Sequence, residues 1–358
     1  MHKKNPVTIL ITGGGAPGIA GTIYSLRKNP DKINTRIIAV DMKEDAVGKY
    51  LADSYYKIPS ADDPDFIENL FELSIQEKVD VILPQVTKEL MPLAAAIGRF
   101  EERGIQIAVS SKDSINKAND KFYATQIAEK IKIPVPLTIL TRTENDLINA
   151  VKKLGFPEKR VVVKPRVSNG MRGLRVVCQP TWDVCRFLNE KPEGTEIGID
   201  DLIKILKKGT WPELLVQEYL PGDEYTIDVF RGLRYEVAIP RLREEIRSGI
   251  TFKALVDERE DLKGFALSLA KEIGLNYAFG FQFKLSESGE PKLLECNPRI
   301  QGTMVVSTIA GYNIIWSAVR EAIKEPVADN LSSLRRNVRF IRYWGGIGVE
   351  NGRKIDQI

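Results

Sequence analysis

Several residue types that support common catalytic chemistries are scarce in this sequence. Histidine occurs once, at His2, near a terminus. Cysteine occurs three times, at Cys178, Cys185 and Cys296, and no two form a CxxC pair. The lone histidine argues against zinc catalysis and histidine acid–base chemistry. The few, odd-numbered cysteines argue against a disulfide scaffold and predict a reducing, cytoplasmic location.

Long apolar runs and an excess of one charge are also missing. No stretch approaches the ~18 consecutive apolar residues that span a membrane. The 52 basic and 48 acidic residues give a net charge of +4, too balanced to predict a nucleic-acid partner. Lysines and a short apolar run at the start suggest a signal peptide. The run leads straight into glycines without a small-residue cleavage site, so we interpret it as a first strand.

What is present fits a globular protein of two or three domains. The chain has 358 residues, of which 43% are hydrophobic and 28% charged. Runs rich in β-formers at 7–12, 35–41, 80–85 and 105–110 alternate with helical patterns. This alternation predicts a first, Rossmann-like α/β domain at 1–112, whose parallel sheet is covered on both faces.

The pattern changes to α+β after a helix predicted at 113–134, which ends before Pro134. The polar segment 190–212 is predicted to be a surface excursion. Further helices are expected at 259–274 and 303–323, and a last strand in RFIRYWGG, 339–346. Short strands are expected at 161–164, 174–177, 214–219, 225–230, 235–241, 279–285 and 292–295.

The glycine-rich turn GGGAPG, residues 13–18, satisfies the pattern GxGxxG between a strand and a helix. Asp41 ends the next strand. In a dinucleotide-binding domain such glycines let the backbone approach a phosphate, and the acid holds a ribose. Many doubly wound domains have the same glycines for steric reasons, and Pro17 removes an N–H from the loop. A nicotinamide oxidoreductase is therefore an alternative, not the main prediction.

A second motif is VVVKPRVSNGMRG, residues 161–173. A strand ends in Lys164 and a loop with Gly170 and Gly173 follows it. Backbone N–H groups of such a loop can fold over phosphates, and the lysine adds a positive charge. A plain hairpin with a glycine turn and an exposed lysine has the same pattern. The spacing alone leaves both interpretations open.

A third motif is LLVQEYLPGDEYTIDVF, residues 214–230. A strand, a Pro-Gly turn and a second strand place Glu218, Glu224 and Asp228 around the turn. The end of the first strand can offer backbone groups to an adenine, and Glu224 can accept ribose hydroxyls. The alternative is a hairpin with a solvated acidic turn.

The fourth motif joins FGFQFKL, which contains Gln282, to LLECNPRIQG, which contains Glu295, Asn297 and Arg299. Glu295 and Asn297 share one face of an extended strand, and Gln282 on a neighbouring antiparallel strand can join them. Oxygen ligands of this kind suit Mg²⁺ that also binds substrate phosphates. A buried carboxylate and amide at the end of an apolar run would need partners in any case. We therefore predict a metal site here.

Together the glycine-rich first domain, NDKFYA, VVVKP, the loop to Gly173, VQEYLPGDEYTIDV and LLECNPRIQG resemble the ATP-grasp superfamily. The likeness covers residues 7–325 and is strongest to one ATP-grasp half of the carbamoyl phosphate synthase large subunit. It implies a pre-ATP-grasp domain at 1–112 and a two-lobed ATP-grasp domain at 113–330. The small lobe would be 135–220 and the large lobe would start at 221. Residues 331–358 would be a C-terminal extension packed on that domain.

The resemblance also implies a role for each motif residue. Lys121 and Lys164 would contact ATP phosphates, beneath a mobile loop containing Ser168, Asn169, Gly170 and Gly173. Glu218, Tyr219 and Leu220 would line the adenine site, and Glu224 would bind the ribose. Gln282, Glu295 and Asn297 would hold Mg²⁺, with Mn²⁺ as a substitute, and Arg299 would steady the transferred phosphate.

The implied activity is a carboxylate–amine ligase that acts through an acyl-phosphate on small-molecule substrates, with a homodimer suggested by family likeness. Arg241 and Arg243 in IPRLREEIRSG are predicted to bind the substrate carboxylate, because guanidinium forks fit such groups. The segment from Gln85 to Glu89 is expected to shape the same pocket. The alternatives are a phosphotransferase or a partial carbamoyl-phosphate-synthase-like activity, since the chain holds one ATP-grasp unit and the synthase two.

Overall fold

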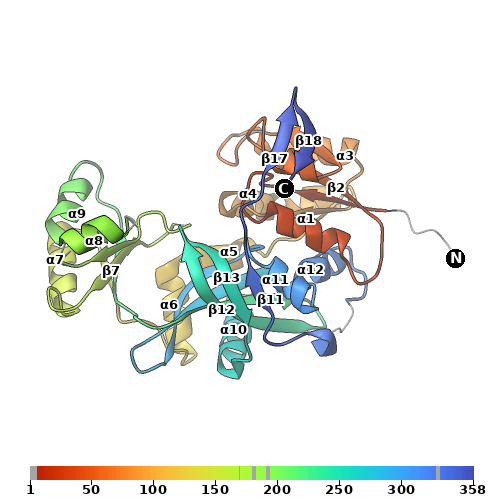
Figure 1. Ribbon diagram of the computed structural model, residues 1–358. Helices are drawn as coiled ribbons and strands as arrows, with labels where there is room; N and C mark the ends of the chain where they lie inside the picture. The colour runs from red at the N-terminus through yellow and green to blue at the C-terminus, as the bar shows by residue number, and fades with distance from the viewer. Residues whose placement is uncertain (1–5, 169, 180–182, 191–193, 328–330) are drawn as a thin grey trace.

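The N-terminal domain contains a parallel sheet, as the sequence predicted. The computed structural model describes residues 6–168, 170–179, 183–190, 194–327 and 331–358. The sheet order is β3-β2-β1-β4-β5, and every pairing is parallel (Figure 1). Its strands are β1 (Val7–Ile11), β2 (Thr35–Asp41), β3 (Ser54–Lys57), β4 (Val81–Leu83) and β5 (Gln106–Ile107). Its helices are α1 (Ile19–Arg27), α2 (Gly48–Leu51), α3 (Phe66–Gln76) and α4 (Thr87–Glu101).

The strand order of this sheet reverses between β1 and β4. In doubly wound sheets ligands bind beyond the carboxyl ends of the strands at such a reversal. The segments that leave these two strand ends are the glycine-rich turn and the stretch from Gln85 to Glu89. Strand β3 was missed from sequence because it is a short, half-buried edge strand without an apolar run.

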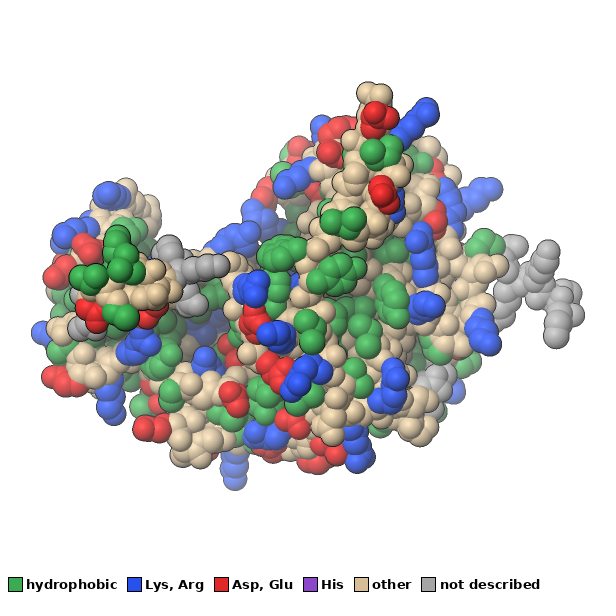
Figure 2. Space-filling model, in the orientation of Figure 1, with side chains coloured by type: hydrophobic (Ala, Val, Ile, Leu, Met, Phe, Trp, Pro, Cys, Tyr) green, Lys and Arg blue, Asp and Glu red, His purple; other side chains and the backbone are tan. Residues whose placement is uncertain are grey.

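A second sheet forms a separate lobe, with the order β6-β10-β7-β8-β9. Its strands are β6 (Thr138–Thr141), β10 (Leu214–Glu218), β7 (Val161–Pro165), β8 (Arg175–Val177) and β9 (Glu196–Ile197). Its helices are α7 (Glu144–Lys153), α8 (Val184–Asn189) and α9 (Ile199–Leu206). Helix α9 corrects the prediction of a plain excursion at 190–212, because Leu202 is buried in this lobe's own core. Figure 2 shows the lobe separated from the remainder by an open cleft.

The largest sheet is antiparallel, with the order β15-β14-β11-β12-β13-β16. Its strands are β11 (Glu224–Arg231), β12 (Glu236–Arg247), β13 (Ile250–Val256), β14 (Tyr277–Leu285), β15 (Pro291–Asn297) and β16 (Arg339–Ile341). One face is apolar, since Phe279, Phe281 and Phe283 pack with residues of α10 (Glu260–Ile273). The other face is polar where it meets the cleft.

Two helices predicted as continuous are broken in the structure. The first becomes α5 (Lys112–Asn119) and α6 (Lys121–Lys130), because Asp120 is extended and its carboxylate caps α6 through the N–H groups of Phe122 and Tyr123. The second becomes α11 (Val305–Ala310) and α12 (Ile314–Ala322), separated at Gly311, whose φ of 112° suits glycine. The break at Asp120 fixes where Lys121 points.

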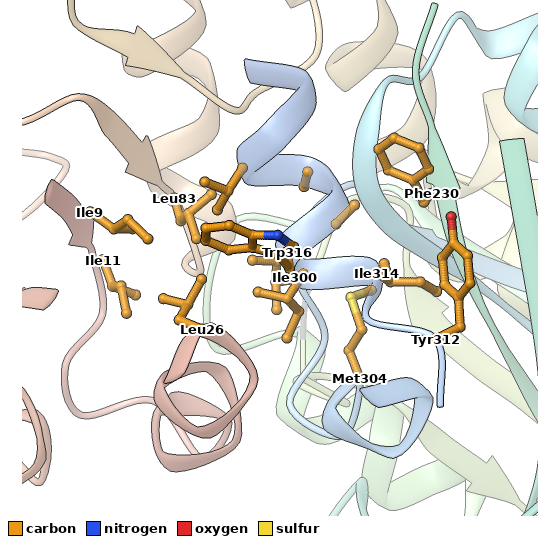
Figure 3. Packing of buried hydrophobic residues seen from close by; sticks show 14 of the residues in the cluster. Ile9, Ile11, Leu26, Leu83, Phe230, Ile300, Met304, Tyr312, Ile314 and Trp316 are labelled. Carbon is orange, nitrogen blue, oxygen red and sulfur yellow. The ribbon is translucent and has the colours of Figure 1, made fainter. Parts of the chain in front are cut away.

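A single apolar core joins the first domain to the large sheet. Ile9, Leu83 and Leu26 of the first domain pack with Trp316 of α12 and Met304, within one cluster (Figure 3). The small lobe has its own core of residues such as Leu147 and Val163. The first domain and the large sheet therefore share buried contacts that the small lobe lacks, which fits a lobe able to move against a rigid base.

The C-terminal segment divides into two parts. After a 3-10 helix at Leu331–Ser333, β16 extends the large sheet by pairing with β13. The predicted last strand is shorter than expected and stops at Ile341. Strands β17 (Ile347–Glu350) and β18 (Arg353–Gln357) then form a two-stranded hairpin that is largely exposed. Within the described residues, no helix combines the length and apolar character needed to cross a bilayer.

Candidate functional site

The polar face of the large sheet carries a row of side chains directly opposite one another. Glu295 of β15 pairs with Gln282 of β14, Gln282 with Thr226 of β11, and Thr226 with Arg241 of β12. Directly paired residues project from the same face, so the row crosses four strands on one side. Two residues along, Asn297 lies opposite Gly280. The three predicted metal ligands are thus brought together at one end of the row.

Two buried lysines lie against this end. Lys121 Nζ donates to the backbone oxygen of Ser168 at 2.5 Å and lies 3.8 Å from Glu295 Oε2. Lys164 Nζ donates to the backbone oxygen of Leu294, next to Glu295, at 3.1 Å. Neither ammonium group is held by two hydrogen bonds to one carboxylate, so both can exchange these contacts for phosphate oxygens. The two come from different lobes, and Lys121 lies near the Glu295 carboxylate while Lys164 lies against the backbone of the preceding residue.

Burial makes both ammonium groups easier to deprotonate. Desolvation lowers the pKa of Lys121, against the opposing attraction of Glu295 and Asp120. Desolvation lowers the pKa of Lys164 to about 8, aided by Lys121 and opposed by Glu295 and Glu224. The pocket thus holds two cations that are incompletely neutralised. A polyanion such as a phosphate chain would neutralise both ammonium groups and favour their charged form.

The donor set at this end fits Mg²⁺ in its chemistry. Asn297 Nδ2 donates to Glu295 Oε1 at 3.2 Å, so the amide and the carboxylate already touch. Mg²⁺ is commonly held by one or two carboxylates together with substrate phosphates. Within the described ranges, no group of three His, Cys, Asp or Glu side chains is arranged as a metal site. This chain can therefore supply one carboxylate and two amides as ligands, and substrate phosphates would provide the others.

The loop after Lys164 passes over the hairpin of β12 and β13. Met171 has a φ of 61°, and its sulfur approaches Gly249, where an added Cβ would lie 2.8 Å from it. Gly170 and Gly173 also have positive φ, and a Cβ on Gly173 would lie 2.5 Å from Pro165. Ser168 is held by Lys121, whereas Asn169 lies outside the described residues. The loop is thereby anchored at its start.

The strand end from Glu218 to Leu220 connects the small lobe to the large sheet. The Glu218 carboxylate accepts from the N–H of Leu137 at 2.8 Å and from Lys292 Nζ at 2.7 Å. Tyr219 has the guanidinium of Arg160 5.2 Å from its ring centroid, and Leu220 is buried. The Glu218 side chain is therefore occupied, which leaves backbone groups of this segment for an adenine.

The comparisons with known proteins agree with this geometry. The family model for ATP-grasp in the biosynthetic pathway with Ter operon matches residues 210–341, and the model for the PylC-like N-terminal domain matches residues 9–108. Residues 210–341 of this chain therefore match an ATP-grasp family. The matched 210–341 segment contains the predicted metal ligands, and the 9–108 segment contains the glycine-rich turn and the stretch from Gln85 to Glu89.

The curated relatives that match this chain are distant. The N-terminal section of the carbamoyl phosphate synthase large chain of Aquifex aeolicus is 23% identical over 278 residues, 74% of this chain and 49% of that protein. The formate-dependent phosphoribosylglycinamide formyltransferase of Wolinella succinogenes is 26% identical over 219 residues, 61% of this chain and 49% of that protein. The chain thus spans about half the length of these curated relatives.

Solved structures share the ATP-grasp fold at low identity. N5-carboxyaminoimidazole synthetase from Staphylococcus aureus, complexed with ADP, superposes with a TM-score of 0.67 at 18% identity, covering 91% of this chain and 80% of that one. Biotin carboxylase from Campylobacter jejuni, in a complex with an ATP analogue, gives a TM-score of 0.68 at 19% identity, covering 94% and 74%. These matches establish the fold over most of the chain.

The ATP-grasp sheet uses Arg241 internally, against the prediction that it binds substrate. Arg241 is 1% exposed, and its Nε and Nη2 donate to the two carboxylate oxygens of Asp228 at 2.6 and 2.9 Å. Asp228 is fully buried, and within the described chain Arg241 Nη1 finds no hydrogen-bond partner. Because its fork is filled by the protein's own carboxylate, Arg241 stabilises the sheet beneath the site. No local pattern in the sequence predicts this pairing.

Arg243 is likewise engaged by the protein rather than free for substrate. It forms an ion pair with Glu224, and its Nε and Nη2 donate to Thr251 Oγ1 at 2.9 Å and the Gly249 oxygen at 2.7 Å. Glu224 is the predicted ribose ligand, so Arg243 positions that carboxylate. Its guanidinium is therefore occupied by groups of the sheet itself.

Asp228 offers a stability test of the buried pair. Replacing Asp228 with alanine leaves the Arg241 guanidinium buried without an anion, and we expect the free energy of unfolding to fall by about 3–5 kcal/mol. The double variant Asp228→Ala/Arg241→Met removes both charges and should be distinctly more stable than the single variant. Urea denaturation measures both. A double variant less stable than Asp228→Ala would contradict this assignment.

The glycine-rich turn of the first domain is closed by its own hydrogen bonds. The N–H of Gly15 donates to Asp41 Oδ2 at 2.7 Å and the N–H of Gly14 to the oxygen of Val40 at 2.8 Å. Gly18 abuts Gly302 of the large lobe, where an added Cβ would lie 2.7 Å from the Gly302 Cα. The carboxylate expected to hold a nicotinamide ribose is thus occupied, and the glycines serve turn and packing.

Arg299 links this first domain to the metal end of the site. Its Nε donates to Thr87 Oγ1 at the start of α4 at 3.0 Å, and burial lowers its pKa. Glu89, two residues further along α4, is buried, accepts from the Thr12 hydroxyl, and has its pKa raised to about 7 by desolvation. Arg299 therefore contacts the segment that follows β4, beside the point where the strand order reverses. The sequence analysis did not predict that Glu89 is a buried acid with a raised pKa.

Proposed function

We propose that this chain is an ATP- and Mg²⁺-dependent carboxylate–amine ligase that works through an acyl-phosphate. The observation that carries the proposal is that Lys121 and Lys164 both lie next to Glu295 or its neighbour Leu294, where the small-lobe sheet faces the large sheet. Two incompletely neutralised cations beside a carboxylate favour a phosphate chain with a divalent ion. The relatives include a carbamoyl phosphate synthase large chain and a phosphoribosylglycinamide formyltransferase, which supports the reaction class.

In the first step an oxygen of the substrate carboxylate attacks the γ-phosphorus of ATP. The bond from that phosphorus to the bridging oxygen breaks, and ADP leaves with the electron pair. Lys164 and Lys121 neutralise charge on the phosphates, and Arg299 lies where the transferred group would be held. Mg²⁺ held by Glu295, Asn297 and Gln282 supplies further charge neutralisation when bound, and Mn²⁺ suits the same oxygen ligands.

In the second step the lone pair of an amine attacks the acyl carbon. The carbon–oxygen bond to phosphate breaks, phosphate departs with that electron pair, and the amine protons pass to phosphate and solvent. Water would hydrolyse the acyl-phosphate, so the loop containing Gly170 and Gly173 is proposed to close over it. Glu224, held by Arg243, is proposed to bind the ribose, and the segment Glu218–Leu220 the adenine.

Product analysis tests this function against the alternatives. The purified chain is incubated with Mg·ATP and pools of carboxylates and amines, with ADP release followed by a coupled assay and products by mass spectrometry. A ligase yields ADP, free phosphate and a new amide in equal amounts. A phosphotransferase leaves the phosphate on the acceptor, which would contradict our proposal. Thermal stabilisation by NADH and not by Mg·ATP would favour an oxidoreductase instead.

A further inference from the structure

A cavity lies between the β12–β13 hairpin and the segment that follows β16. Its volume is about 270 Å³. It is lined by three aromatic side chains, three basic ones and one acidic one, namely Phe252, Tyr343, Trp344, Arg247, Lys253, Arg342 and Glu245. We call it the aromatic pocket. Its mixed lining is suited to a small molecule with both an apolar and a charged part.

The aromatic side chains form an open platform. Phe252 is buried, and its ring centroid lies 5.1 Å from that of Trp344. Trp344 and Tyr343 are each 77% exposed. Large exposed aromatic rings rimmed by charges usually mark a contact surface. Because the buried Phe252 fixes one wall, a planar or branched apolar group can pack against Trp344 without rearranging the sheet.

Among the three basic side chains of the aromatic pocket, Arg342 is the one that forms no ion pair with a carboxylate of the described residues. Glu245 is shared by Arg247 at 2.8 Å and Lys253 at 2.7 Å. Arg342 is half-buried and donates only to backbone oxygens, of Thr251 and of Gly302, both at 3.2 Å. Burial lowers its pKa, and no carboxylate of the described residues forms an ion pair with it. A partly desolvated guanidinium without a carboxylate is a site for an anionic group.

Arg342 also ties the aromatic pocket to the reaction centre. Gly302, which accepts from Arg342, is three residues beyond Arg299 and abuts Gly18 of the first domain. Thr251, which also accepts from Arg342, receives a hydrogen bond from Arg243, the partner of Glu224. A ligand bound to Arg342 would therefore be separated only by that side chain from Gly302, which is three residues along the chain from Arg299.

We propose that the aromatic pocket binds the nucleophilic substrate, and that this substrate is an amine bearing an anionic group beside an aromatic or bulky apolar group. The proposal rests on the ligase function proposed above. The anionic group pairs with Arg342, and the apolar group packs on the exposed ring of Trp344, which Phe252 supports from below. Bound in this way, the amine is directed along the Gly302 segment toward the acyl-phosphate.

Calorimetric binding to the full chain saturated with Mg·AMP-PNP tests this proposal without turnover. The probes are L-phenylalanine, L-alanine, 2-phenylethylamine and phenyl phosphate. We expect L-phenylalanine to bind at least about tenfold more tightly than L-alanine, which lacks the ring, and than 2-phenylethylamine, which lacks the carboxylate. Tighter binding of phenyl phosphate than of L-phenylalanine would identify the anion as a phosphate. Equal binding of all four probes, or of none, would overturn the proposal.

Two variants assign the two preferences to their residues. In Trp344→Ala the ratio of L-phenylalanine to L-alanine affinities should fall to near one, while the preference over 2-phenylethylamine persists. In Arg342→Ala the preference for L-phenylalanine over 2-phenylethylamine should be lost, while its preference over L-alanine persists. Arg342→Lys should restore part of the preference for the anionic probe. Arg353→Ala, on the exposed hairpin strand β18, is the matched control and should keep both ratios.

The same experiments separate this proposal from the ligase function on which it rests. If the unmodified chain fails to bind Mg·AMP-PNP, the ligase function is wrong. If it binds the nucleotide and both probe ratios are unchanged in the variants, only the aromatic-pocket proposal is wrong. A change in sedimentation coefficient for Trp344→Ala with unchanged probe binding would assign the exposed rings to a protein interface, and would also overturn it.

Discussion

Replacing Glu295 with glutamine should remove the metal dependence of ATP binding. Glu295 is the only carboxylate among the three proposed ligands, and it lies beside both Lys121 and Lys164. The amide keeps the shape but loses the charge that a divalent cation requires. We expect Mg²⁺ to raise the affinity of the unmodified chain for ATP by at least about tenfold, and to have little effect on Glu295→Gln. Calorimetric titration with and without Mg²⁺ measures both.

The matched control for that variant is Glu290→Gln. Glu290 is an exposed acid in the turn that joins β14 to β15, so it changes the net charge equally without reaching the pocket. Its response to Mg²⁺ should equal that of the unmodified chain. If Glu295→Gln retained the full response, the metal would have to be held elsewhere.

The second large effect is a pH dependence of nucleotide binding that depends on Lys164. Its pKa in the ligand-free protein is lowered to about 8 by burial. Phosphate binds the charged ammonium, so the fraction of competent protein falls as pH rises above 8. In metal-free buffer the affinity for ATP should therefore decline by up to about tenfold per pH unit above 8. Titrations from pH 6.5 to 9.5 would follow this decline.

Two substitutions separate the charge of Lys164 from its shape. Lys164→Arg keeps a positive charge across this pH range, so the decline attributable to residue 164 should disappear. Lys164→Met fills similar space without charge, and should weaken binding at pH 7 by about tenfold or more while also flattening the profile. A decline that persisted unchanged in Lys164→Met would place the titrating group elsewhere.

Much of the fold follows from local patterns in the sequence. The run TRIIAVD coincides with β2, because a buried parallel strand needs a continuous apolar stretch and little else. The alternation in FGFQFKL placed the phenylalanines on one face and Gln282 on the other, and the sheet uses both faces in that way. Such periodicities are set by backbone geometry, so a single sequence reveals them.

What the sequence could not reveal depends on partners distant in the chain. Arg241 and Asp228 are thirteen residues apart, and only the pairing of β11 with β12 brings their side chains together. The same register places Arg243 on Glu224, so two guanidinium groups that looked free for substrate are neutralised within the sheet. A motif indicates which groups are present, whereas the strand register decides which of them remain available.

The aromatic pocket illustrates the same limit. Phe252 and Trp344 lie 92 residues apart in sequence and meet because β16 adds to the edge of β13. The expected strand RFIRYWGG included Trp344, but the strand ends at Ile341 and frees the following residues to line a cavity. Edge-strand length is a weak signal in sequence, because half-exposed strands lack a continuous apolar run.

The central claim is that one pocket between the lobes gathers a nucleotide, a divalent ion and the groups that neutralise them. Calorimetric titration of the full chain with AMP-PNP in the presence of Mg²⁺, repeated with Lys164→Met, tests this claim most directly. We predict one nucleotide per chain, bound at least about tenfold more weakly after the substitution. Absence of binding to the unmodified chain, or equal affinity in the two proteins, would contradict the account.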